Sequence, residues 1–291
     1  MIAPFHLHRP QSLKEASSLL LEFKGDARVL AGGSELILLL KMGLAEVSHV
    51  VDIKKIPGLS VLEYDAGKRQ LSIGPLVTHR ELEKSAIVHA HFPLIAEMEK
   101  QLANVRIRNV GTLAGNLSFA EPHADPGTLL VAYNASVKLA SAAGERVLNL
   151  EDFFVDYYET VLKGDELLAE ITIPKPAENS RGAYLRFCPG ERPMVGVAFL
   201  AEWANGVCHK PRLVLGCVGP RPLRASEAEA WMTGKSRDKI QAGADDLGAQ
   251  AARASQPLED IWGSVEYKRQ IVKTLVGRAI TSATQKQAGH E

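Results

Sequence analysis

Two adjacent glycines near the N-terminus are the feature that most constrains how this chain can fold. Gly32 and Gly33 follow the apolar run ARVLA and precede the leucine-rich stretch SELILLLKMG, which ends at Gly43. The first run is typical of a strand and the second has the spacing of a helix. The pair therefore lies in a strand-to-helix turn, where the missing Cβ permits positive φ and a close approach to the backbone.

A second turn of similar composition, GTLAGN, occupies residues 111–116. Successive N–H groups in such turns can point at an anion, and the hydroxyls of Ser34 and Thr112 add donors. Two such turns facing each other suit a diphosphate, particularly if Ser34 opens the helix. No third glycine completes a Rossmann fingerprint and no GK[ST] completes a P-loop. A purely structural role as a tight bend or helix cap stays open on these residues alone.

Composition excludes several classes of protein. The 291 residues carry 34 basic and 34 acidic side chains, so we expect no nucleic-acid partner. The N-terminal residues lack a basic segment followed by an apolar core, and no apolar run is long enough for a membrane span, which predicts a cytoplasmic protein. Cys188, Cys208 and Cys217 form no CxxC and are one thiolate short of an iron–sulfur ligand set. We expect no metal site and no disulfide framework.

Periodicity and capping signals predict an α+β protein. Ser12 and Thr78 have capping-box spacing before helical stretches, the second of them residues 79–88. Strands are expected in residues 136–141 and 166–174, and a helix is expected between residues 128 and 134. After the polar linker PKPAENSRG, an antiparallel meander with an Asn205–Gly206 turn leads to C-terminal helices, one of them at residues 238–254.

The two glycine turns belong to a longer set of motifs. AGGSELILLLKMG, IGPLVTHRELE, VRIRNVGTLAGNLSFAEPHADPG, AYLRF and LVLGCVGPRPLRA, in this order, resemble the FAD-binding medium subunit of molybdenum hydroxylases nearly end to end. The resemblance implies a two-part FAD-binding domain of the vanillyl-alcohol-oxidase (PCMH) type at 1–176, with subdomains at about 1–57 and 58–176. A C-terminal domain with a small antiparallel sheet plus helices follows at 177–291.

The resemblance also implies a set of residues that bind FAD noncovalently. The first loop and the central motif would hold the diphosphate, one aspartate the AMP half, and one leucine would pack on the cofactor; an arginine occupies the basic strand position. These residues are Ala31, Gly32, Gly33, Ser34, Glu35, Leu36, Thr112, Ala114, Gly115, Asn116, Asp125, Leu168 and Arg186. No residue of this chain is expected to be catalytic toward the organic substrate.

Other readings of these residues stand beside the implied roles. Asp125 could cap the helix that begins near Pro126. His79, which follows Thr78, could approach the ligand, but a histidine at a helix start is more often a surface residue. Arg106 and Arg108 are typical of solvated charges that flank a turn. Leu168 would pack in a core with or without a flavin.

The chain departs from the family pattern at three places. Ala114 replaces a common glycine and is compatible only with negative φ. Phe119 stands where a polar residue is frequent, so a hydrogen bond to the cofactor is in question. The stretch at 187–195 is about three residues shorter than usual and lacks an Asp-x-Ala element, which leaves the electron acceptor open.

The resemblance further implies an FAD-carrying electron-transfer subunit of a molybdenum hydroxylase, an oxidoreductase of several chains. A large subunit would hold the molybdenum–pterin cofactor, and a small subunit would hold [2Fe–2S] clusters and pass electrons to this chain, in a dimer of heterotrimers. One alternative is a self-contained flavoenzyme of the wider superfamily, with flavin attached through His79 or His123. Another is a cofactor-free scaffold subunit.

Overall fold

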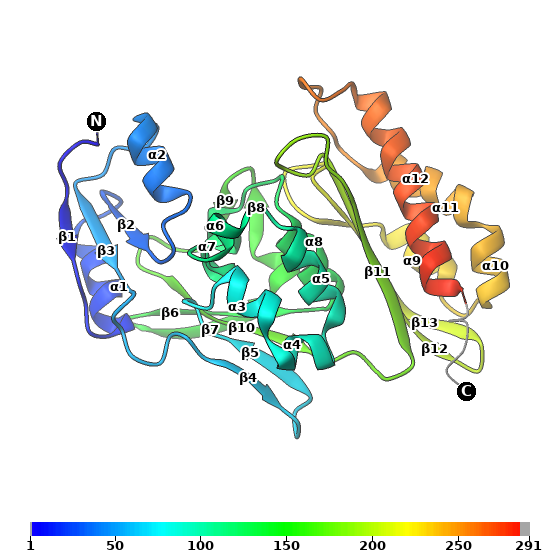
Figure 1. Cartoon of the computed structure of the whole chain (residues 1–291), viewed down its shortest axis with the longest axis horizontal. Coiled ribbons are helices and arrows are strands. Elements are labelled where there is room, and N and C mark those ends of the chain that lie inside the picture. The colour runs from blue at the N-terminus through cyan, green and yellow to red at the C-terminus, as the bar shows by residue number, and fades with distance from the viewer. Residues whose placement is uncertain (1, 286–291) are drawn as a thin grey trace. The chain divides into compact units, whose positions relative to one another are not determined.

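The computed structural model describes residues 2–285, which form two compact units (Figure 1). Among these residues, unit 1 comprises 2–120 and 135–174, and unit 2 comprises 121–134 and 175–285. Residues 121–134 therefore belong to unit 2, and the chain returns to unit 1 before it enters unit 2 again at residue 175. The domain boundary expected after residue 176 stays a prediction. The two domains were expected to span 1–176 and 177–291, and of these residues 1 and 286–291 lie outside the described part of the chain.

Unit 1 begins with a small parallel sheet in the order β1-β3-β2, with two helices between its strands. Its elements are β1 (His6–His8), α1 (Leu13–Glu22), β2 (Ala27–Leu30), α2 (Leu36–Met42) and β3 (His49–Asp52). Ser12 caps α1 by accepting the N–H of Glu15, and Gly43 ends α2 at φ 70°. Both boundaries predicted from sequence are confirmed. Ala16 and Leu20 of α1 pack into a buried cluster with Val51 of β3.

A five-stranded antiparallel sheet, in the order β4-β5-β10-β6-β7, forms the rest of unit 1 with five helices and a short hairpin. The sheet strands are β4 (Leu62–Asp65), β5 (Gln70–Ile73), β6 (Ser136–Ser141), β7 (Gly144–Asn149) and β10 (Leu167–Pro174). The helices are α3 (His79–Lys84), α4 (Ala86–His91), α5 (Pro93–Gln101), α6 (Val105–Arg108) and α7 (Leu113–Phe119). A 3-10 turn at Leu150–Asp152 precedes the hairpin of β8 (Phe154–Asp156) and β9 (Glu159–Thr160).

The helix predicted over residues 79–88 is present in two pieces. Thr78 begins α3 with the expected capping box to Glu81. Ser85 then adopts an extended ψ of 121°, and its side chain accepts the N–H of Val88 to cap α4. The single-helix prediction was wrong because Ser85 competes with the helix interior for backbone hydrogen bonds.

Unit 2 is built on a four-stranded antiparallel meander. Its strands are β11 (Ser180–Phe187), β12 (Val195–Ala204), β13 (Val207–Gly216) and β14 (Leu223–Arg224). Its helices are α8 (Asp125–Ala132), α9 (Ser226–Met232), α10 (Arg237–Ala242), α11 (Ala244–Ala254) and α12 (Val265–Thr284). Asn205 and Gly206 both have positive φ and form the expected hairpin turn. The helix predicted at 238–254 was wrong, because Gly243 divides it into α10 and α11.

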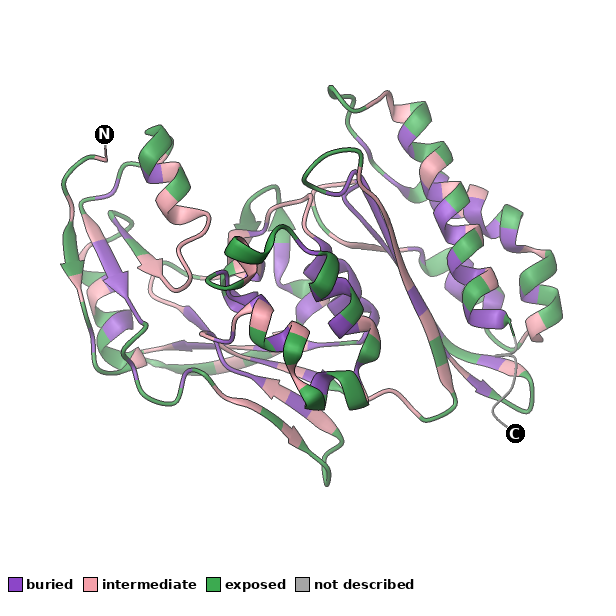
Figure 2. Ribbon diagram, in the orientation of Figure 1, coloured by how far each residue is buried: buried purple, intermediate pink, exposed green. Residues whose placement is uncertain are grey.

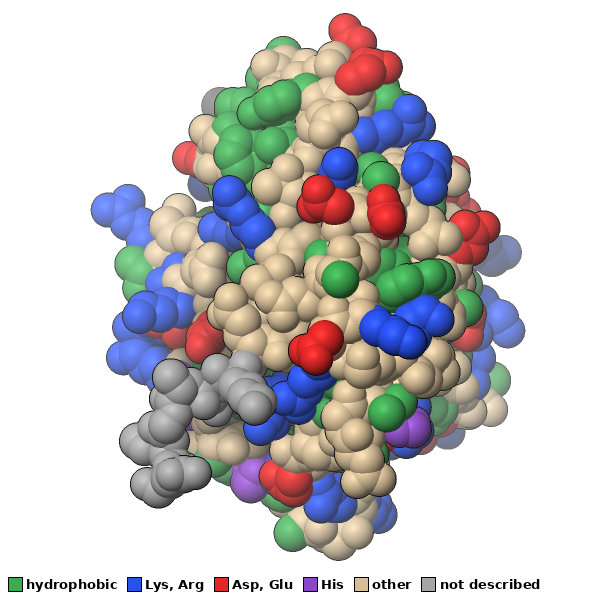
Figure 3. Space-filling view, turned by 90° about the vertical axis from the view of Figure 1, so that its right-hand side faces the viewer, with side chains coloured by type: hydrophobic (Ala, Val, Ile, Leu, Met, Phe, Trp, Pro, Cys, Tyr) green, Lys and Arg blue, Asp and Glu red, His purple; other side chains and the backbone are tan. Residues whose placement is uncertain are grey.

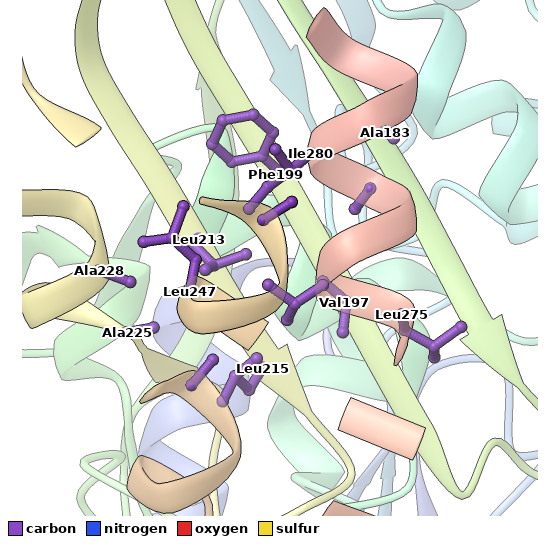
Figure 4. Packing of buried hydrophobic residues seen from close by; sticks show 14 of the residues in the cluster. Ala183, Val197, Phe199, Leu213, Leu215, Ala225, Ala228, Leu247, Leu275 and Ile280 are labelled. Atoms are coloured by element: carbon purple, nitrogen blue, oxygen red, sulfur yellow. The ribbon is translucent and has the colours of Figure 1, made fainter. Parts of the chain in front are cut away.

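Alternation along the strands decides which residues of unit 2 face its helices. On β12, Val197 and Phe199 join the apolar core beneath α9 to α12, with Leu213 and Leu215 of β13 (Figure 4). The helices accordingly bury one side and expose the other (Figure 2). Successive side chains of a strand point to opposite faces, so the intervening residues face away from these helices.

Charges of both signs are mixed on the surface. On the face shown in Figure 3, basic and acidic side chains are interspersed and no continuous basic area is seen. This agrees with the balanced count of 34 basic and 34 acidic residues. Within residues 2–285, no helix is both long and apolar enough to cross a membrane.

Candidate functional site

The first glycine turn connects β2 to α2 in unit 1. Gly33 has φ 77°, which only glycine adopts readily, and its carbonyl accepts the N–H of Ile37 at 3.0 Å. Glu35, with helical backbone angles, is the N-cap of α2 and makes no side-chain cap. Ser34 is therefore not the N-cap of α2, which begins one residue later than it would if Ser34 capped it. The Ser34 hydroxyl does not cap the helix.

The second glycine turn leads into α7. Thr112 is the N-cap, and its Oγ1 accepts the N–H of Gly115 at 3.0 Å. A Cβ on Gly115 would stand 2.9 Å from that oxygen. Ala114 is buried within α7 and has negative φ, which is the backbone conformation that alanine in place of the usual glycine requires.

The two turns are in direct contact. A Cβ on Gly32 would lie 2.1 Å from the carbonyl oxygen of Val110 and 2.9 Å from Cα of Gly111. A Cβ on Gly111 would lie 3.3 Å from Oγ of Ser34. The two turns thus face each other. Contacts and backbone angles within the chain explain both glycines: Gly32 leaves room for the backbone of the second turn, and Gly33 adopts a positive φ.

Polar groups at these turns have unused hydrogen-bonding capacity. In the part of the chain that the structure describes, the N–H groups of Gly32, Gly33, Ser34 and Ala114 donate no hydrogen bond. The Oδ1 atom of Asn116 is buried and also lacks a partner there. Neighbouring N–H groups of this kind are suited to the oxygens of a phosphate. These residues therefore fit the diphosphate of a bound dinucleotide.

Leu168 lies elsewhere in unit 1, on β10. Its side chain is buried, opposite Leu139 of β6, and the register shifts between Leu168 and Glu170. Burial in a core was one of the two roles expected for this leucine.

Unit 2 brings Asp125 and Arg186 together. Arg186 Nη1 donates to Asp125 Oδ2 at 2.7 Å, and the hydroxyl of Tyr184 donates to Oδ1 at 2.6 Å. Burial raises the pKa of Asp125, while the Arg186 charge and both hydrogen bonds oppose that rise. Burial also raises the pKa of Tyr184 well above its usual range, with the Asp125 charge contributing.

Sequence analysis did not identify Tyr184 as a site residue, although the alternation of AYLRF places it on the same strand face as Arg186.

The alternative role for Asp125 was a helix cap. Asp125 is instead the first residue of α8, and Ala124, the N-cap, makes no side-chain cap. The capping interpretation was wrong because the carboxylate is turned to the strand β11.

The other departures have local explanations. Phe119 packs against Tyr158 with ring centroids 5.4 Å apart. The shortened stretch forms a turn in which Cys188 Sγ donates to Gly190 O at 3.0 Å. A Cβ on Gly190 would stand 2.7 Å from the ring of Trp262, so this turn lies against an aromatic side chain of unit 2.

The solvent exposure expected near the second turn was wrong for His79 and Arg108 but right for Arg106. His79 is 2% exposed, and its Nδ1 lies 2.8 Å from Oε2 of the fully buried Glu99. Arg108 donates to Glu83 at 2.9 Å and to the Leu102 carbonyl at 2.7 Å, whereas Arg106 is exposed. Glu99 and Glu83 are distant in sequence from His79 and Arg108, so no local pattern identified these two pairs.

Comparison with known proteins decides the family. Residues 3–176 match the family model described as the FAD binding domain in molybdopterin dehydrogenase, and residues 189–283 match that of the CO dehydrogenase flavoprotein C-terminal domain. The chain belongs to the FAD-binding medium subunits of molybdenum hydroxylases. The resemblance found in the sequence is therefore confirmed.

Individual relatives of this medium subunit agree. The carbon monoxide dehydrogenase medium chain of Hydrogenophaga pseudoflava is 32% identical, covering 97% of this chain and 98% of its own length. The nicotine 6-hydroxylase medium subunit of Paenarthrobacter nicotinovorans is 31% identical, covering 94% and 95%. A solved structure of carbon monoxide dehydrogenase from Hydrogenophaga pseudoflava superimposes with a TM-score of 0.91 at 32% identity, covering 97% and 98%.

The predicted fold class is confirmed by this match: an FAD-binding domain followed by a sheet with helices. The medium subunit is an FAD-binding part of a multi-subunit oxidoreductase, in a family whose molybdenum–pterin and iron–sulfur centres are carried by other subunits. Within residues 2–285, no group of three His, Cys, Asp or Glu side chains is arranged to hold a metal ion.

Proposed function

We propose that this medium subunit takes electrons from a [2Fe–2S] subunit of its complex and passes them to a terminal acceptor. When bound, FAD supplies a centre that can accept electrons singly and release a pair. The observation that carries the proposal is the contact between the two glycine turns, where four N–H groups are left without partners among the described residues.

The chain's own residues would hold the diphosphate at these turns. Residues 31–36 form the first loop, and Thr112, Ala114, Gly115 and Asn116 form the second. Backbone N–H groups bind an anion without contributing a charge of their own. Thr112 keeps the second loop in place through its bond to Gly115.

We propose that Asp125 binds the AMP half of FAD and that Arg186, which is hydrogen-bonded to Asp125, belongs to the same part of the site. A carboxylate offers about four lone-pair sites, so two donors leave room for a further hydrogen bond. Tyr184 and Arg186 hold the carboxylate in one orientation. Leu168 is proposed to pack on the cofactor, and its burial supports an apolar role.

The proposal extends to assembly. The partners are a large subunit with the molybdenum–pterin cofactor and a small [2Fe–2S] subunit, in a cytoplasmic dimer of heterotrimers. The functional division falls after residue 176, with subdomains at about 1–57 and 58–176 for FAD and 177–291 as the C-terminal domain. Chemistry on the organic substrate belongs to the large subunit, so no residue here is assigned a catalytic role.

Rapid mixing of the purified complex with its organic substrate tests the electron-transfer role. Absorbance of the [2Fe–2S] clusters and of the flavin should bleach in that order, and the acceptor should restore the flavin band. A complex whose flavin absorbance never changes during turnover would contradict the proposal. Isolation of the chain as an active alcohol or aldehyde oxidase without partners would contradict it as well.

A further inference from the structure

His79 is tied to the second glycine turn by its own backbone. It is the first residue of α3, and its N–H donates to the carbonyl of Gly111 at 3.0 Å. The side chain is 2% exposed. An imidazole buried this deeply is expected to satisfy both ring nitrogens.

One ring nitrogen is satisfied by Glu99. This residue of α5 has no exposed surface, and its Oε2 lies 2.8 Å from His79 Nδ1. This bond leaves the other ring nitrogen, Nε2, available for a second partner. A buried carboxyl group is rarely left without a partner, and the imidazole of His79 is the partner that Oε2 faces. The second oxygen, Oε1, has no hydrogen-bond partner within residues 2–285.

The opposite edge of the imidazole borders the place where the two glycine turns meet. Cδ2 of His79 lies 3.3 Å from the point that a Cβ on Gly111 would occupy, and Oγ of Ser34 lies 3.3 Å from the same point. Nε2 is covalently bonded to Cδ2 and so belongs to this edge. Among the described residues Nε2 has no hydrogen-bond partner.

We propose that His79 is a ligand of the FAD diphosphate, donating Nε2–H to a phosphate oxygen beside Ser34. Glu99 is the positioning residue: its carboxyl group fixes the ring orientation through Nδ1. The site thus combines backbone N–H donors with one buried side-chain donor. This inference rests on the proposed FAD role of the glycine turns, and it adds a side-chain ligand that the glycine motifs do not contain.

Titration of apoprotein with FAD, and with ADP in competition, tests the inference on the full chain. His79→Gln approximately keeps the size of the side chain but removes the imidazole and its Nε2–H. We expect FAD and ADP to lose affinity by a common factor of roughly 10- to 100-fold, as for a hydrogen bond to a charged group, because they share the diphosphate. His209→Gln, at an exposed position on β13, is the matched control and should bind FAD as the wild type does.

Two further measurements separate a ligand from a structural residue. Glu99→Gln should weaken FAD binding, and the His79→Gln, Glu99→Gln double variant should lose no more than His79→Gln alone, because the two act as a unit. In the wild type, addition of ADP should shift the ring-nitrogen NMR signals of His79. This readout needs no variant, so it applies even if a substitution prevents folding.

The outcomes distinguish the role of His79 from the proposed FAD-binding function on which it rests. Folded His79→Gln with wild-type affinity for FAD and ADP, or ring signals that ignore ADP, would overturn the role of His79 alone. A wild-type apoprotein that takes up no FAD would overturn the proposed function and this inference together. Parallel loss of FAD and ADP affinity with an intact control would establish it.

Discussion

The contact between the glycine turns predicts a large effect for a single methyl group at position 32. A Cβ on Gly32 would meet the Val110 carbonyl oxygen at 2.1 Å and Cα of Gly111 at 2.9 Å. Non-bonded carbon contacts are most favourable at about 3.5 Å or more, so the turns must separate by roughly 1 Å. Both neighbours are backbone atoms, and no rotamer change relieves the clash.

We expect Gly32→Ala to lower the free energy of unfolding by about 1–3 kcal/mol, the usual effect of overfilling a packed site. Two other glycines separate the causes. A Cβ on Gly164 would meet nothing within 4 Å, and its φ is not positive, so Gly164→Ala should be nearly neutral. Gly43→Ala also meets nothing but has φ 70°, so it reports the backbone cost alone, about 1–2 kcal/mol.

Urea unfolding at 25 °C, followed by circular dichroism, measures these differences, and flavin titration measures the consequence for binding. Gly32→Ala should reduce FAD affinity roughly tenfold or more, equivalent to about 1.4 kcal/mol, because the two loops no longer meet. Gly164→Ala should leave the affinity unchanged. The same unfolding midpoint and FAD affinity for Gly32→Ala and Gly164→Ala would refute the reasoning.

Three further substitutions test other contacts by urea unfolding. Burial raises the pKa of Glu83, but hydrogen bonds from two arginines outweigh it and lower the pKa below the ordinary 4.5. The stability this gives is present above pH 4.5 and lost as pH falls through the lowered value, so wild type and Glu83→Gln should converge in acid; parallel profiles would contradict this. Thr112→Ala should cost about 1 kcal/mol by removing a helix cap, and Thr112→Ser should restore it; an unchanged midpoint for Thr112→Ala would count against the cap. Asp125→Ala should cost about 3 kcal/mol because it breaks the buried pair with Arg186, against about 1 kcal/mol for Tyr184→Phe; equal costs would disprove the pairing argument.

Local signals in the sequence were sufficient for much of the fold. The caps at Ser12 and Thr78 and the turn at Asn205–Gly206 depend on residues no more than a few positions apart, and all are present. Ser85 and Gly243 break two predicted helices. Each residue type disfavours a helix interior, so the signal was present but was outweighed by the apolar spacing around it.

The candidate site depended on contacts that no local pattern contains. Gly32 was identified as a turn residue, yet the reason for glycine there is the carbonyl of Val110, far along the chain. His79 was taken for a surface residue because its burial depends on Glu99 of another helix. Contacts of this kind are set by how elements pack, which hydrophobic spacing does not specify.

The flavin content of the purified chain tests the central claim most directly. The absorption spectrum of the native protein, followed by release of the cofactor with heat or acid and its identification, requires no partner subunit. We expect a yellow protein that releases about one FAD per chain without a covalent remnant, because the diphosphate site proposed at the glycine turns is noncovalent. A folded, colourless chain that takes up no added FAD would contradict it.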